Sequence, residues 1–320
     1  METVSEPAVL ASGLRKSYGG VPVLDGLTLE VAGSSVFALL GPNGAGKTTT
    51  VRILATLLDA DGGDARVAGC DIRRERSTLR KRISLTGQYV AVDDLQTGAE
   101  NLRMIGRLAG LSVGASRRRA DELLERFGLA EAAARRAGTY SGGMRRRLDL
   151  AASLVTQPDV LFLDEPSTGL DPTSRLQLWD AVAELVGAGV TVFLTTQYLD
   201  EADRLADRIA VLDGGRIVAE GTADDLKRRV AEDRLELRLH SDVPFSELLV
   251  CLDGRLLHAD PTERTLAVRT DGGARDVRAL LDMLDPDGTG VAEFALQKAT
   301  LDDVFLTLTG HTTGKETAHV

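Results

Sequence analysis

A glycine-rich segment, Gly41–Thr48, constrains the fold of this chain more than any other feature. It reads GPNGAGKT, follows the apolar run Val36–Leu40 and precedes the helical sequence TTVRILATLL. This is the G-x-x-x-x-G-K-[ST] pattern in the strand–loop–helix context that it requires. Such a loop binds phosphate because its glycines let backbone N–H groups converge on the oxygen atoms, at the positive end of the following helix. We therefore expect an α/β domain built around a nucleotide phosphate.

Two side chains of this loop have specific expected roles. The Lys47 ammonium can reach the β- and γ-phosphates, and the Thr48 hydroxyl offers an oxygen to Mg²⁺. A glycine-rich turn without a ligand is the alternative, and the flanking strand and helix disfavour it. The ATP-binding residues expected here are Gly41, Pro42, Asn43, Gly44, Ala45, Gly46, Lys47, Thr48 and Thr49.

A second apolar run, Val160–Leu163, ends in the two carboxylates Asp164 and Glu165. A buried strand that ends in acidic residues is a common holder of Mg²⁺ in phosphoryl-transfer sites. Asp164 is therefore the candidate metal ligand, and Glu165 the candidate base for the attacking water. A pair of acidic residues at the end of a strand also occurs by chance.

A third signal is Ser141-Gly142-Gly143, which precedes the helical run MRRRLDLAASLV. The serine and the bare N–H groups would lie at a helix N-terminus and form a second anion site. A plain helix N-cap explains the same residues.

Together, the phosphate loop, the serine–glycine–glycine helix start and the VLFLDEP strand shortly after it resemble the ABC ATPases over roughly residues 8 to 222. In that family two subunits dock head to tail. The Ser141 helix of one subunit then covers the γ-phosphate held by Lys47 of the other. The resemblance thus implies a dimer with two shared ATP sites.

Two more positions match the family residue by residue. Tyr18, upstream of the first strand of the motif, is similar to the aromatic residue that stacks on adenine. A buried core tyrosine is the alternative. Gln88, in LTGQYVAVDDLQTG, is similar to the glutamine that links magnesium to the loop sensing the membrane subunit, and a surface glutamine is the alternative.

The segment Ser167–Asp171 (STGLD) resembles the family loop that crosses the dimer interface, where Asp171 would link the two sites. On its own it is a turn containing glycine and aspartate. Gln197, in LTTQYLDEAD, stands where most relatives place a histidine that touches the γ-phosphate. We expect Gln197 to assist hydrolysis as a positioning contact.

The signature of this chain is YSGGM rather than LSGGQ. This departure, Gln197, RRRLDLAASL and the near-terminal TLDDVFLTLTG resemble the daunorubicin- and doxorubicin-resistance ATP-binding subunits, as far as about Gly310. That resemblance implies ATP-driven export of an amphipathic antibiotic through a separate membrane permease. Export of a lipid or glycan, a soluble ABC protein acting on ribosomes or DNA, and a module that binds ATP without hydrolysis are the alternatives.

Apolar runs predict strands at Val36–Leu40, Val160–Leu163 and Val190–Thr195, in a mostly parallel sheet with packed helices. The expected domains are an ABC ATPase domain at 8–222 with a helical subdomain at about 100–140, a linker helix at 223–230, a small α+β domain at 231–310, and a disordered tail at 311–320. In the small domain we expect a strand at 235–240, a helix at 244–252, a hairpin across Asp260 and Pro261, a helix at 277–284, a strand at 291–296 and a last helix.

Composition limits the partners. Thirty-eight basic against 48 acidic residues give a formal charge of −10, the wrong sign for a nucleic-acid coat. Cys70 and Cys251 suit a reducing cytoplasm. No apolar stretch reaches the roughly 20 residues that span a bilayer, and METVSEPAVL lacks signal-peptide features. We therefore expect a protein at the cytoplasmic face of the membrane, attached through its permease.

Overall fold

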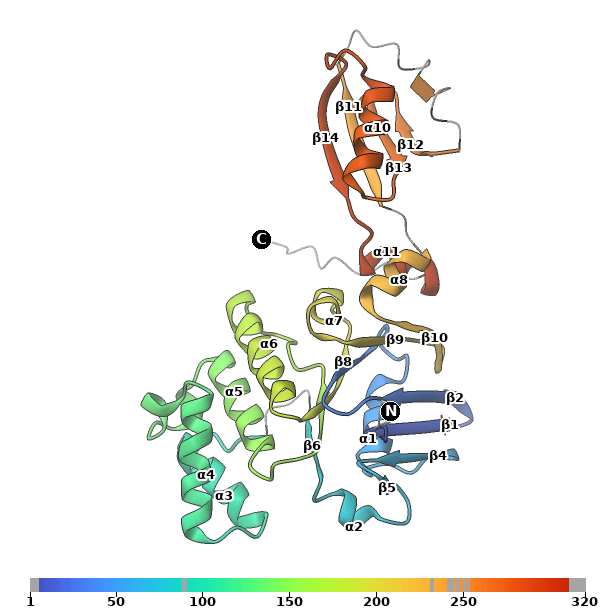
Figure 1. The fold of residues 1–320 in the computed structure, drawn as a ribbon. Coiled ribbons are helices and arrows are strands. Elements are labelled where there is room, and N and C mark those ends of the chain that lie inside the picture. The colour runs from blue at the N-terminus through green and yellow to red at the C-terminus, as the bar shows by residue number, and fades with distance from the viewer. Residues whose placement is uncertain are drawn as a thin grey trace, which may run out of the picture. The chain divides into compact units, whose positions relative to one another are not determined.

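The computed structural model describes residues 6–87, 91–230, 233–240, 245, 248–249, 252 and 254–310. The chain divides into two compact units, Met1–Ala223 and Asp224–Val320 (Figure 1). Among the described residues, no helix has the length and apolar character that crossing a bilayer demands.

The first unit is built around a six-stranded sheet in the order β10-β9-β3-β8-β7-β6. Its strands are β3 (Val36–Leu40), β6 (Ile83–Thr86), β7 (Val160–Asp164), β8 (Thr191–Thr196), β9 (Arg208–Asp213) and β10 (Arg216–Gly221). All neighbours pair in parallel except β9 and β10. Every residue of β3, β7 and β8 is buried, as in parallel sheets covered on both faces. The three strands expected from the sequence are confirmed, with β8 starting one residue later.

A second sheet of four antiparallel strands, in the order β2-β1-β4-β5, was not expected from the sequence. It contains β1 (Val9–Tyr18), β2 (Val21–Val31), β4 (Gly62–Val67) and β5 (Cys70–Asp71), all labelled in Figure 1. In β2, Leu27, Leu29 and Val31 are buried whereas Thr28 and Glu30 are exposed. This alternation belongs to a sheet with one covered face.

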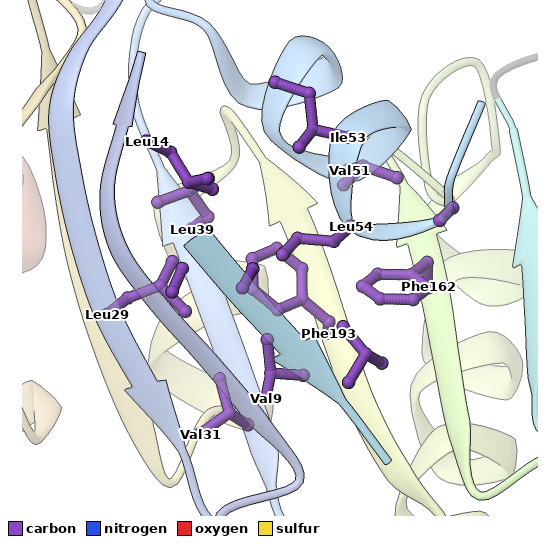
Figure 2. Close-up of a cluster of buried hydrophobic side chains, with 14 of the residues drawn as sticks. Val9, Leu14, Leu29, Val31, Leu39, Val51, Ile53, Leu54, Phe162 and Phe193 are labelled. Carbon is purple, nitrogen blue, oxygen red and sulfur yellow. The ribbon is translucent and has the colours of Figure 1, made fainter. Parts of the chain in front are cut away.

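Helix α1 (Lys47–Leu54), which starts in the phosphate loop, packs in a core shared with both sheets. Figure 2 shows Val51, Ile53 and Leu54 of α1 beside side chains from both sheets. Phe193 of the parallel sheet has its ring centroid 5.6 Å from that of Phe162. Because α1 is held by this packing, its N-terminus has a fixed position at the edge of the sheet.

The stretch expected to be helical, at about 100–140, begins with a helix at Gly98. Helix α3 (Gly98–Leu108) is capped by Thr97 and Glu100, which bond reciprocally, and it packs on α4 (Val113–Arg126). Two 3₁₀ turns follow, η1 (Ala130–Ala132) and η2 (Ala137–Thr139), before α5 (Gly142–Ser153). The remaining helices are α2 (Arg76–Leu79), α6 (Pro172–Gly187) and α7 (Leu199–Leu205).

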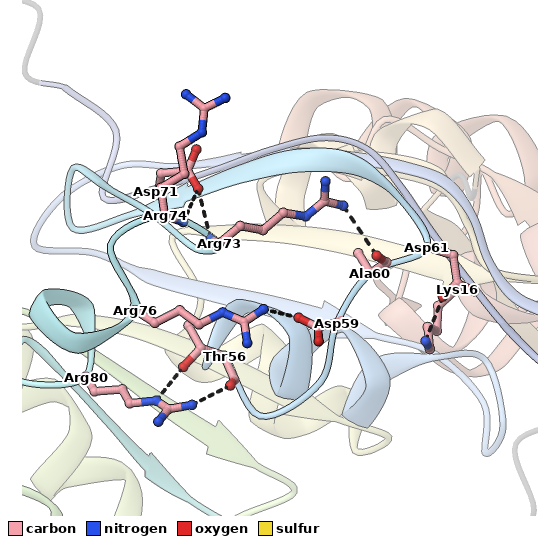
Figure 3. Close-up of polar contacts among 10 residues, drawn as sticks. All are labelled: Lys16, Thr56, Asp59, Ala60, Asp61, Asp71, Arg73, Arg74, Arg76 and Arg80. Atoms are coloured by element: carbon pink, nitrogen blue, oxygen red, sulfur yellow. Dashed lines mark hydrogen bonds and ion pairs between the residues drawn. The ribbon is translucent and has the colours of Figure 1, made fainter.

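Polar contacts fix the segment between α1 and α2 (Figure 3). Arg80 donates to the Thr56 hydroxyl at 2.9 Å and to the Thr56 carbonyl at 3.0 Å. Lys16 forms an ion pair with Asp61 at 2.7 Å. The Lys16–Asp61 ion pair is exposed at the Asp61 carboxylate and contributes little to stability. The Arg80–Thr56 bonds are part-buried and tie the turn after α1 to the residue that follows α2.

The second unit contains a four-stranded antiparallel sheet in the order β12-β13-β11-β14. Its elements are α8 (Ala223–Val230), β11 (Arg234–Leu239), β12 (Leu256–Asp260), β13 (Thr265–Arg269), α10 (Ala274–Leu284), β14 (Val291–Gln297) and α11 (Leu301–Thr309). Leu280 and Leu284 of α10 share a core with β11 and β13. The hairpin across Asp260 and Pro261 is confirmed. The helix expected at 244–252 lies mostly outside the described residues, and the tail at 311–320 lies wholly outside them.

Candidate functional site

The phosphate loop connects β3 to α1 and needs glycine at two of its positions for steric reasons. Gly46 has a φ of +109°, a left-handed backbone that residues with a side chain rarely adopt. A Cβ there would lie 2.7 Å from Leu24 Cδ2 and 2.9 Å from the Val23 carbonyl oxygen. A Cβ on Gly41 would collide with the Leu212 carbonyl oxygen. The close packing of this loop therefore excludes larger residues at both positions.

Lys47 is the first residue of α1, and its side chain is 4% exposed. Its ammonium donates to the carbonyl oxygens of Gly41 at 2.8 Å and Pro42 at 3.2 Å. It also lies 3.4 Å from Glu165 Oε1. Burial lowers the pKa of Lys47, while Glu165 and Asp164 oppose that shift. An anion at the loop would stabilise the charged form of this buried lysine.

Asp164 ends β7 and lies directly opposite Thr195 of β8. The hydroxyl of Thr195 donates to Asp164 Oδ1 at 2.5 Å, and the hydroxyl of Thr48 donates to the same oxygen at 3.2 Å. Asp164 is 5% exposed, and its carboxylate accepts hydrogen bonds from both hydroxyl groups. Thr195 is a site residue that the sequence analysis missed, although the threonine pair at the end of the strand was visible.

Glu165 follows β7 with a φ of +50°, which is uncommon for a residue with a side chain. Its N–H donates to the Thr195 carbonyl at 3.0 Å, and its carboxylate contacts Lys47. Left-handed backbone at a residue of this kind costs about 1–3 kcal/mol and is concentrated at functional sites. The turn at Glu165 brings its carboxylate to the phosphate loop, beside Asp164.

Ser141 caps α5 by accepting a hydrogen bond from the Met144 N–H at 3.2 Å. A Cβ on Gly143 would collide with Ser174 Oγ, so the start of α5 packs closely on the start of α6. Asp171 caps α6 and holds Ser174, accepting from its N–H at 2.9 Å and its hydroxyl at 2.6 Å. The N-cap alternative for Ser141 is thus realised in the structure, and it is compatible with anion binding.

The expected site residues form two groups. The loop Gly41–Thr49, Asp164 and Glu165 lie together at the carboxyl edge of the parallel sheet, and Gln197 immediately follows β8 at this edge. Ser141-Gly142-Gly143 and Asp171 form a second group. Among the described residues, no hydrogen bond or ion pair joins the two groups.

Tyr18 ends β1 and is 48% exposed, so the alternative of a buried core tyrosine is wrong. Its ring centroid lies 5.7 Å from the Lys16 ammonium. Gln88 lies outside the described residues, and its expected role stays a prediction.

Comparison with known proteins agrees with this geometry. The family model described as ABC transporter matches residues 24–168, and the model described as ATP-binding protein DrrA1-3-like, C-terminal domain matches residues 221–309. A solved structure of the ATP-binding subunit of an ABC transporter aligns with a TM-score of 0.62 at 28% identity, covering 69% of this chain and 92% of that chain.

Two curated relatives align over nearly the whole chain. The daunorubicin/doxorubicin resistance ATP-binding protein DrrA of Streptomyces peucetius is 54% identical, covering 97% of this chain and 95% of the relative. The doxorubicin resistance ATP-binding protein DrrA of Mycobacterium tuberculosis H37Rv is 46% identical, covering 94% and 93%. With its phosphate loop, its buried lysine and its paired carboxylates, this chain belongs to the ABC transporter family as an ATP-binding subunit with ATPase activity.

Proposed function

We propose that this chain powers export of an amphipathic antibiotic, such as an anthracycline, through a separately encoded membrane permease. The observation that carries the substrate class is the 54% identity to the Streptomyces peucetius relative across both units, including residues 221–309. Relatives named for Nod factor export and linearmycin resistance are 37% and 34% identical. Export of a different molecule, such as a lipid or glycan, is therefore the second candidate.

The nucleotide would be ATP with Mg²⁺. The oxygen atoms of Thr48 and Asp164 lie 3.2 Å apart, and hydroxyl and carboxylate oxygens are the hard donors that Mg²⁺ prefers. One or two carboxylates beside substrate phosphates are enough for this ion, and Gln88 is the proposed further ligand. When bound, Mg²⁺ neutralises charge on the phosphate oxygens. Thr195 keeps the Asp164 carboxylate oriented by its 2.5 Å hydrogen bond.

Hydrolysis would depend on Glu165. Its carboxylate lies 3.4 Å from the buried Lys47 ammonium, so the proposed base is next to the cation that would bind the phosphates. In the proposed reaction the attacking water transfers a proton to the Glu165 carboxylate while Lys47 holds the β- and γ-phosphates. Backbone N–H groups of Gly41–Thr49 bind the remaining phosphate oxygens.

Gln197 is proposed as the residue that positions the γ-phosphate or the water. Its amide can donate a hydrogen bond but, unlike a histidine, cannot carry a proton near neutral pH. We expect Gln197→Ala to slow turnover at least about tenfold, roughly 1.4 kcal/mol of transition-state stabilisation. Gln197→His should stay active because imidazole supplies a similar donor. ATPase rates at saturating ATP test both variants, and a parent rate for the alanine variant would assign Gln197 a structural role only.

The two groups of site residues suit a head-to-tail dimer. In this arrangement Ser141-Gly142-Gly143 of one copy cover the γ-phosphate held by Lys47 of the other. Asp171 would link the two sites, because its bonds to Ser174 tie the loop after β7 to the start of α5. The exposed ring of Tyr18 would stack on adenine.

We assign the transport pathway to the separate permease partner. We place the contact with that partner near Gln88–Glu100 and the helical subdomain at 100–140. The chain would then lie at the cytoplasmic face of the cell membrane.

An uptake experiment tests the substrate class. Inverted vesicles containing this chain and its permease partner should accumulate daunorubicin when MgATP is added. Vesicles with the Glu165→Gln variant serve as the matched control and should not accumulate the drug. An active ATPase complex that moves a lipid or glycan but leaves daunorubicin outside would overturn the antibiotic assignment.

A further inference from the structure

Helix α5 carries a buried ion pair that the hydrolysis mechanism does not use. Arg146 and Asp149 are each 4% exposed, and Arg146 Nη1 lies 3.3 Å from Asp149 Oδ2. Burial lowers the pKa of Arg146 and raises the pKa of Asp149. Taking two charges out of water is costly, and apolar residues of similar volume often replace such a pair without loss of stability. The presence of this pair at such a position therefore needs another explanation.

The ion pair forms hydrogen bonds with backbone groups of two segments that are far apart in the sequence. Arg146 Nε donates to the Pro166 carbonyl at 2.7 Å, and Nη1 donates to the Gly87 carbonyl at 2.8 Å. Asp149 Oδ1 accepts a hydrogen bond from the Ala91 N–H at 3.0 Å. Thus one ion pair fixes three backbone groups from two loops.

These backbone groups adjoin the residues of the proposed mechanism. Pro166 directly follows Glu165, the proposed base, whose backbone already adopts a left-handed φ of +50°. Gly87 and Ala91 are the described residues on either side of 88–90, the stretch that contains Gln88. The ion pair therefore holds the backbone directly after Glu165 and the backbone at Gly87 and Ala91.

The same helix begins at the second anion site. Ser141 caps α5, and Arg146 lies five residues further along it, roughly 7–8 Å up the axis. A helix of 12 residues moves as one body, so displacing its N-terminus displaces Arg146. Arg146 Nη2 is buried and has no hydrogen-bond partner among the described residues, which adds to the cost of burying the pair.

We propose that Arg146 and Asp149 are positioning residues that transmit contact at the Ser141 helix end to the turn at Glu165 and to the backbone at Gly87 and Ala91 of the same copy. In the head-to-tail dimer, Ser141 of one copy touches the nucleotide bound by the other. The ion pair would then make hydrolysis in one site depend on ATP in the second site. This inference rests on the proposed dimer.

The test compares kcat, KM and ATP affinity in the full chain. Arg146→Gln should lower kcat at least about tenfold while changing the ATP dissociation constant less than about threefold, because Lys47 and its loop are untouched. Asp149→Asn keeps an oxygen acceptor for the Ala91 N–H and should lose less activity. Arg145→Gln is the matched control, since Arg145 is the preceding residue of α5 and its side chain is 38% exposed. It should retain the parent kcat.

The steepness of the ATP response separates positioning from a structural role. The parent should respond to ATP with a Hill coefficient above one, and Arg146→Gln should reduce that coefficient toward one. If Arg146→Gln fails to fold, the double variant Arg146→Met/Asp149→Leu removes both charges and should fold, yet still show the low kcat. A parent-like kcat in a folded Arg146→Gln or double variant would overturn the inference.

Failure of the inference can be told from failure of the dimer itself. A parent chain that hydrolyses ATP only as a monomer would refute the proposed dimer. A parent chain that forms an ATP-dependent dimer, with an Arg146→Gln variant that keeps the parent rate and Hill coefficient, would refute only the role of the ion pair.

Discussion

Glu165→Gln is expected to bind ATP as tightly as the parent and to lose at least about a hundredfold in turnover. The glutamine amide fills the same space and keeps an oxygen for the Lys47 ammonium, which lies 3.4 Å from Glu165 Oε1. It cannot accept the proton of the attacking water, and a positioned general base contributes typically 10²–10⁴-fold to a rate.

Steady-state ATPase rates and equilibrium nucleotide binding measure the two effects separately. Glu125→Gln makes the same chemical change on the exposed side of α4 and is the matched control, with the parent rate expected. Turnover of Glu165→Gln within a fewfold of the parent would show that a different group is the base.

Lys47→Ala is expected to weaken ATP binding about 10- to 100-fold. A hydrogen bond to a charged group is worth about 1.5–3 kcal/mol, and the lost ammonium is the buried cation of the loop. The change also leaves the buried Glu165 carboxylate without its cation, 9% exposed and close to the phosphate charge. Electrostatic repulsion then adds to the loss.

Fluorescent nucleotide binding without turnover measures the effect of Lys47→Ala. Lys81→Ala removes an exposed lysine and should bind as the parent does. Unchanged affinity in a folded Lys47→Ala variant would contradict the assignment of the phosphate loop.

The sequence predicted those parts of the site that lie close together in the chain. The phosphate loop Gly41–Thr48 could be predicted because the loop, the strand before it and the helix after it are contiguous in the sequence. Asp164 and Glu165 were predicted because acidic residues that directly follow an apolar run mark the end of a buried strand. The strands β3, β7 and β8 were predicted from apolar runs of the same kind.

Other features depend on which segments meet in space. Thr195 contacts Asp164 because β7 and β8 pair in register, and no local pattern specifies that pairing. The antiparallel sheet was not predicted because its strands pair across a long stretch of sequence. Strand β1, of 10 residues, pairs with β4, of six residues, and no local pattern indicates this pairing. Arg146 and Asp149 lie in a run that the sequence predicted to be helical, but their burial depends on contacts with Gly87, Ala91 and Pro166, which are remote in the sequence.

The central claim is that ATP is held between two copies of the chain, and the mass of the Glu165→Gln variant in solution tests it most directly. Light scattering should give about the chain mass of 34.1 kDa without nucleotide and twice that value with MgATP. Gly142→Asp, added to this variant, should prevent the doubling, because its carboxylate would repel the γ-phosphate. A Cβ at Gly142 has nothing within 4 Å, and an acidic residue at the start of a helix favours the helix, so this control should fold. A Glu165→Gln chain that binds ATP to saturation and stays at the single-chain mass would contradict the account.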